Sequence, residues 1–129
     1  MTKESNVSDP IMVMTMLKEA KGIDLELEYR NVGTYVFLLR SRGVPFSYSF
    51  HLYPMPISDN LNEDLTELKR AQFIDYNSPI FLTSEGEKYL DKWIIPSGMR
   101  KSIRQGLNEF RGHNPKMLFD AVYESAVSV

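Results

Sequence analysis

The sequence predicts an α+β fold that is mostly helical, and three observations support this. Apolar residues recur at helical spacing over most of the chain. Apolar and polar side chains alternate from residue 46 to residue 53, and two β-rich arms flank the turn at residues 77–79. The chain has 129 residues and no cysteine, so we expect one domain that buries its core without disulfides.

The N-terminal part predicts one helix and an ambiguous segment. Ser8 or Asp9 can cap the helix, and Pro10 suits its first position because the missing N–H would be unpaired there. Gly22 can close the helix in a left-handed conformation. Residues 23–29 alternate apolar and acidic side chains, so strand and helix both stay open.

A second helix is predicted over residues 30–41, and Gly43 and Pro45 end it. Its apolar residues fall on one face: Val32, Tyr35, Val36 and Leu39. The alternating segment that follows predicts a half-buried strand. Its inward residues are Phe46, Tyr48, Phe50 and Leu52.

Two prolines separate this strand from a third helix. Because a residue before proline avoids the helical region, we expect Tyr53 and Met55 to be extended. Ser58, Asp59 or Asn60 can then cap a helix over residues 59–71. This helix is expected to bury Leu61, Leu65 and Leu68.

The rest of the chain predicts a hairpin and three more helices. Residues 73–83 form the hairpin, and Ser84 with Glu87 makes a capping box for the fourth helix. The residues that this helix should bury are Tyr89, Leu90 and Trp93. The fifth helix presents Met99, Ile103, Leu107 and Phe110 on one stripe, and the sixth buries Leu118, Ala121 and Val122.

Helix, helix, strand, helix and hairpin is the order of a winged helix, in which the third helix is the one that reads DNA in many domains. We therefore predict a flexible lead over residues 1–8, a winged-helix core over 9–95 and a helical extension of the same domain over 96–129.

Three motifs carry a family resemblance. They read Tyr48-x-Phe50-x-Leu52-Tyr53-x-x-Pro56-x-Ser58-x-x-Leu61-x-x-Asp64-Leu65-x-x-Leu68, then Phe73-Ile74, then Leu82-Thr83-x-x-Gly86-x-x-x-Leu90. This pattern resembles the Panacea family, the SocA-like group of prokaryotic antitoxin and phage-associated domains. The family's Gly-Pro-aromatic-Ser turn is Met55-Pro56-Ile57-Ser58 here, so Met55 replaces the glycine and Ile57 the aromatic residue.

The resemblance implies a cytoplasmic, non-catalytic module that neutralises a toxin or serves as a protease adaptor through direct protein contact. The residues themselves give no sign of an enzyme, a cofactor or a metal. The two histidines, His51 and His113, belong to no catalytic or metal-binding motif. No apolar run is long enough to cross a membrane.

The third helix decides between DNA and protein as the partner. Its outward residues include four acids, Asp59, Glu63, Asp64 and Glu67, and only two bases, Lys69 and Arg70. Carboxylates entering a groove walled by phosphates are repelled. The turn at 77–79 also has no Lys or Arg to grip phosphate.

We therefore predict that another protein, for example a basic toxin, is the partner. The predicted contact residues are Asn60, Glu63, Asp64, Glu67, Tyr53 and Met55. The alternative is a DNA-binding transcriptional regulator. Its contact residues would be Asn60, Asn62, Lys69, Arg70, Arg100, Lys101 and Arg104. The C-terminal helices offer a surface for a homodimer.

Overall fold

The computed structural model describes residues 7–127, and these form six α-helices, one 3₁₀ turn and two antiparallel sheets of two strands each. The fold is α+β and mostly helical, which confirms that part of the prediction. Of the predicted lead, residues 1–6 lie outside the described residues.

Helix α1, Asp9–Gly22, runs through the centre of the molecule. All residues from 11 to 17 are buried, as expected for a helix that is covered on every side. Ser8 is the N-cap residue and a proline stands in the first turn. The left-handed residue after the helix is Asp24, with φ of 57°, so the prediction for Gly22 is wrong. Gly22 is the last helical residue, and the turn is made two positions later.

The ambiguous segment after α1 is neither an α-helix nor a full strand: residues 23 and 24 form a turn, Leu27 makes one β-bridge, and Tyr29 begins a 3₁₀ turn. The amide of Ile80 donates to the carbonyl of Leu27 over 2.8 Å, which makes an isolated antiparallel bridge. The 3₁₀ turn Tyr29–Asn31 and helix α2, Val32–Ser41, follow. The four residues predicted for the apolar face of α2 are all buried, and Gly43 ends the turn after it with φ of 100°.

The prediction of a long strand from residue 46 is wrong, because residues 44–50 are not part of any sheet. Burial alternates along them as expected, with Phe46 and Tyr48 buried. However, this segment has no strand beside it among the described residues, and its hydrogen bonds go elsewhere: the Ser47 amide donates to Asp9 over 3.0 Å. Only β1, His51–Leu52, is a strand, and it pairs with β2, Pro56–Ile57.

Helix α3, Asp59–Arg70, begins at Ser58, whose hydroxyl accepts from the Leu61 amide over 3.2 Å. The prediction that it buries Leu61, Leu65 and Leu68 is confirmed. The hairpin is confirmed as well. Its strands are β3, Ile74–Asp75, and β4, Phe81–Leu82, with Ile74 opposite Leu82.

Helix α4, Ser84–Leu90, differs in its cap from the prediction. Thr83 is the N-cap residue, and its hydroxyl accepts from the Gly86 amide over 3.0 Å. Because α4 ends at Leu90, Trp93 lies beyond it and is 41% exposed instead of buried. Tyr89 stacks on Phe73, with ring centroids 4.5 Å apart.

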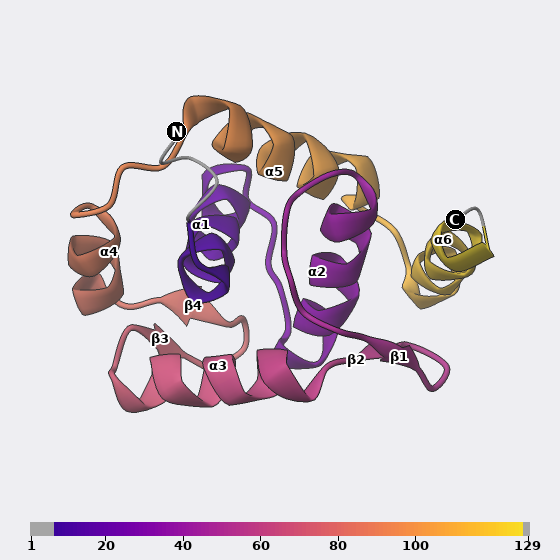
Figure 1. Ribbon diagram of the computed structural model, residues 1–129, viewed down its shortest axis with the longest axis horizontal. Coiled ribbons are helices and arrows are strands. Elements are labelled where there is room, and N and C mark those ends of the chain that lie inside the picture. Colours follow the sequence, from indigo (N-terminus) through magenta and orange to yellow (C-terminus); the bar gives the residue numbers. More distant parts are fainter. Residues whose placement is uncertain (1–6, 128–129) are drawn as a thin grey trace.

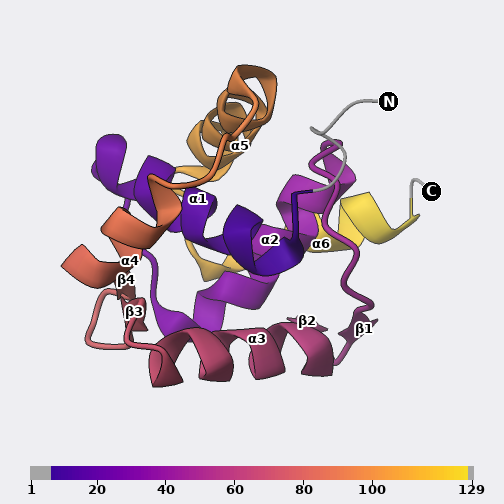
Figure 2. The same cartoon turned by 60° about the vertical axis from the view of Figure 1, so that its left-hand side comes forward.

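Helices α5, Ser97–Phe110, and α6, Pro115–Val127, complete the chain. Helix α5 packs on α1 and α2, and α6 packs on α2. Figure 1 and Figure 2 both show α5 on one side of the central helices and α3 on the opposite side. The two helices therefore present separate surfaces.

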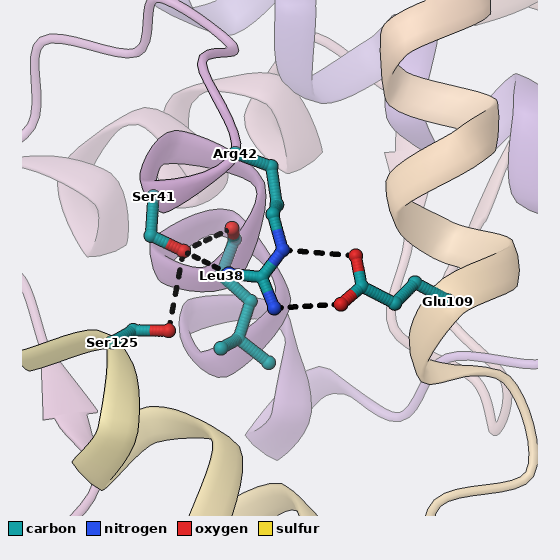
Figure 3. Close-up of polar contacts among 5 residues, drawn as sticks. All are labelled: Leu38, Ser41, Arg42, Glu109 and Ser125. Atoms are coloured by element: carbon teal, nitrogen blue, oxygen red, sulfur yellow. Dashed lines mark hydrogen bonds and ion pairs between the residues drawn. The ribbon is translucent and has the colours of Figure 1, made fainter. Parts of the chain in front are cut away.

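A polar junction joins the ends of α2 and α5 and reaches α6 (Figure 3). Arg42 donates to both carboxylate oxygens of Glu109, over 2.9 and 2.6 Å. The hydroxyls of Ser41 and Ser125 lie 3.4 Å apart. The Arg42 hydrogen bond lowers the pKa of Glu109, and this outweighs the opposing effect of burial. These contacts link the end of α5 and helix α6 to the end of α2.

Candidate functional site

The outer face of α3 is acidic in its N-terminal two thirds. Asn60 is exposed, and a shallow depression beside it is lined by Asp59, Asn62, Glu63, Thr66 and Glu67. We call these six residues the α3 face. Neither Asp59 nor Glu63 forms an ion pair with any described residue. Their charge is available to a partner.

The two bases of α3 are already paired with acids. Lys69 lies 3.4 Å from Asp75, and Arg70 lies 2.5 Å from Glu67, one turn earlier. All four side chains are well exposed to solvent, so each pair contributes at most about 1 kcal/mol. The structure thus places Lys69 and Arg70 at the C-terminal end of α3 with their charge partly neutralised.

Asp64 lies apart from the other predicted contact residues of α3. Its carboxylate accepts a 2.6 Å hydrogen bond from the hydroxyl of Tyr48, and it is half-buried. Burial raises the pKa of Tyr48 far above its ordinary value, and the bond to Asp64 raises it further. The hydroxyl therefore stays protonated and donates. This bond fastens residues 44–50 to α3.

The apolar part of the predicted site is divided. Tyr53 is 82% exposed at the tip of the β1–β2 hairpin, while Met55 packs against the core. Leu52, predicted to point inward, is 42% exposed. The β1–β2 hairpin projects from the body of the molecule (Figure 1), and Leu52 is therefore exposed because no core lies beside this strand.

The basic residues of α5 lie on the far side of the molecule from α3 (Figure 2). Arg104 is paired with Glu19 of α1 over 2.7 Å, and the Glu19 side chain is only 8% exposed. Arg100 and Lys101 are exposed and form no ion pair with the described residues. No single flat surface can therefore use both Lys69 and Arg100.

The tip of the β3–β4 hairpin adds no positive charge. The Ser78 hydroxyl donates to the carboxylate of Glu28, so an acid stands beside the turn. His51 is exposed in β1, and His113 packs edge-on against Phe110 at 5.4 Å. Within residues 7–127, no group of three His, Asp or Glu side chains is arranged to hold a metal ion.

Two features of the structure were not predicted from the sequence. Glu19 is a buried acid on the central helix, and its neighbours Lys18 and Lys21 gave no sign of that burial in the sequence. A groove also lies between the end of α1, residues 24–27 and β4. The alternation of Leu25, Glu26 and Leu27 was the available signal, but it left strand and helix both open and gave no pairing with the hairpin.

None of the helices described is long and apolar enough to span a membrane. Comparison with protein-family models, curated proteins and solved structures finds no match to this chain. The assignment of a function therefore depends on the surfaces described above.

Proposed function

We propose that this protein is a non-enzymatic interaction module of the winged-helix type that binds a basic protein through the α3 face. The observation that carries this proposal is the charge of that face. Its acids Asp59 and Glu63 are unpaired among the described residues, whereas both bases of α3 are held in ion pairs.

The order of the elements supports the winged-helix part of the proposal. Residue Leu27 lies between α1 and α2 and is bridged to Ile80, the residue immediately before β4. Leu27 thus occupies the position of the strand that follows the first helix of a winged helix and lies beside the hairpin. The sequence left open whether this segment is a strand or a helix. Helix α3 precedes the hairpin directly, as the recognition helix does in such domains.

Electrostatics favour a protein partner over DNA. Two like charges 4 Å apart repel by about 1 kcal/mol in water and by about 4 kcal/mol near a protein surface. The N-terminal part of a recognition helix enters the groove, and here that part carries the unpaired acids. Against a basic protein surface, the same acids would be attracted instead of repelled.

The positions of the basic residues also favour a protein partner over DNA. Phosphate contacts come from Lys and Arg on one face of a DNA-binding domain. In this fold the bases predicted to contact DNA are divided between the end of α3 and α5, and these two helices lie on opposite sides of the molecule (Figure 1). A DNA-binding regulator that uses Asn60, Asn62 and Lys69 therefore remains the second candidate.

The resemblance to the Panacea family suggests how such binding would be used. We propose an antitoxin or adaptor that acts in a prokaryotic cytoplasm by covering the basic surface of a partner, such as a nucleic-acid-binding toxin. The exposed Tyr53 supplies an apolar contact of the kind that anchors protein interfaces. Dimerisation through the C-terminal helices stays a prediction.

The test is binding of the product of the neighbouring gene, measured by calorimetry. Charge reversal by Glu63→Lys and Glu67→Lys should weaken binding at least tenfold. The matched control, Asp120→Lys and Glu124→Lys on α6, should leave it within twofold. Equal affinities of the two double variants would remove α3 from the interface, and the absence of any binding would refute the proposed partner.

A further inference from the structure

The groove beside β4 has the size and lining of a binding site. Its volume is about 400 Å³, within the range of ligand-binding clefts. Helix α1 contributes Leu17 and Ala20, residues 24–27 contribute Leu25, and β4 contributes Phe81 and Leu82. Most of the lining is thus apolar, although the groove is open to solvent.

One wall of the groove is an incompletely paired strand edge. The Thr83 amide donates to the Phe73 carbonyl, so the main chains of residues 81 and 83 face β3. Those of residues 80 and 82 face the groove. The Ile80 amide is bonded to Leu27, but no hydrogen bond from the described residues reaches the main chain of Leu82. The open part of this edge is thus the main chain of one residue, Leu82, which is 8% exposed, and an extended chain can pair there.

The charges at the rim indicate the chemistry of that chain. Both lysines are paired, Lys18 with Asp91 at 3.5 Å and Lys21 with Glu87 at 3.6 Å. Asp24 and Glu26 are exposed and form no ion pair with the described residues. The unpaired charge of the groove is therefore negative.

We propose that this groove binds a short extended segment of a partner polypeptide, in which an apolar residue stands next to Lys or Arg. The segment adds to the edge of β4 through Leu82, its apolar side chain enters the groove, and its basic side chains meet Asp24 and Glu26. Strand addition gives affinity through the main chain and specificity through alternate side chains. This site is separate from the α3 face and does not depend on it.

The experiment is a fluorescence anisotropy titration of the full chain with a labelled peptide, Val-Lys-Leu-Arg-Val. We expect saturable binding that weakens at least fivefold when the two basic residues are replaced by Glu. Two complementary N-methylated peptides, one modified at Lys and Arg and the other at Leu, test the main-chain contact. One of the two should bind at least tenfold more weakly than the parent peptide.

The matched variants separate this site from α3. Asp24→Asn keeps a residue that tolerates the left-handed φ of 57°, and Glu26→Gln keeps the shape of its side chain. Together they should weaken binding of the peptide at least fivefold, while Glu63→Gln and Glu67→Gln on α3 should not. The proposal is overturned if the acidic peptide binds equally, if both N-methylated peptides bind as the parent does, or if the two double variants behave alike.

Discussion

Replacement of Tyr48 by Phe tests how α3 is held in place. The substitution removes only the hydroxyl that donates to Asp64 over 2.6 Å. A hydrogen bond to a charged group contributes about 1.5–3 kcal/mol. Because Asp64 is half-buried, water can replace part of the lost bond. We therefore expect the free energy of unfolding to fall by about 1.5 kcal/mol.

Urea unfolding measured by circular dichroism gives this quantity from the midpoint and slope of the transition. The control is Tyr123→Phe, because Tyr123 is 62% exposed on α6. It should change the free energy of unfolding by less than about 0.5 kcal/mol. A cycle with Asp64→Asn should show a coupling of about 1 kcal/mol between the two side chains. If Tyr48→Phe and its control were equally stable, the bond would not hold residues 44–50 on α3.

Two other substitutions test the packing and the polar junction. A Cβ at Gly86 would lie 2.0 Å from the carbonyl oxygen of Phe73, so Gly86→Ala should lower the free energy of unfolding by about 1–3 kcal/mol in the same urea assay. The control is Gly22→Ala, which should not lower the free energy of unfolding because the space around Gly22 is open. Arg42 lowers the pKa of Glu109 below its ordinary 4.5, so the pair stabilises the fold above that pH and this contribution is lost as the pH falls through the lowered pKa. Glu109→Gln should therefore cost up to about 1 kcal/mol at pH 7 and progressively less towards pH 3, and a cost that is independent of pH would contradict this assignment.

The helices were predictable because their signals are local. The leucines of α3 and the apolar stripe of α5 repeat at helical spacing. The three leucines are buried, and so is the α5 stripe apart from Met99, which is partly buried. Caps were less certain, since adjacent hydroxyl residues compete. Thr83 rather than Ser84 caps α4, because Thr83 lies in extended backbone just before the first helical turn.

The strands were harder to predict because pairing depends on distant residues. Residues 44–50 alternate like a strand, yet the alternation only reflects a chain lying between core and solvent. The residue that pairs with the outer edge of the hairpin is Leu27, which is bridged to Ile80 and lies more than fifty residues before it in the chain. No local pattern distinguishes that pairing from a helix.

The sequence predicted the negative charge of α3, but it could not show which of the charged side chains are already paired within the protein. The outward position of Glu63 follows from helical spacing. The pairing of Asp64 with Tyr48, and of Arg104 with Glu19, required the tertiary structure. These contacts remove two predicted site residues from the freely available charges and leave the acids at the start of α3.

The most direct test of the central claim is a titration of fluorescent duplex DNA with the wild-type protein at several salt concentrations. We predict no saturable binding near physiological salt, because unpaired acids at the start of α3 would face the phosphates. Submicromolar affinity that falls steeply between 50 and 200 mM salt is the behaviour of a protein with several phosphate contacts. That result, if abolished by Asn60→Ala, would contradict the assignment of α3 to a protein partner.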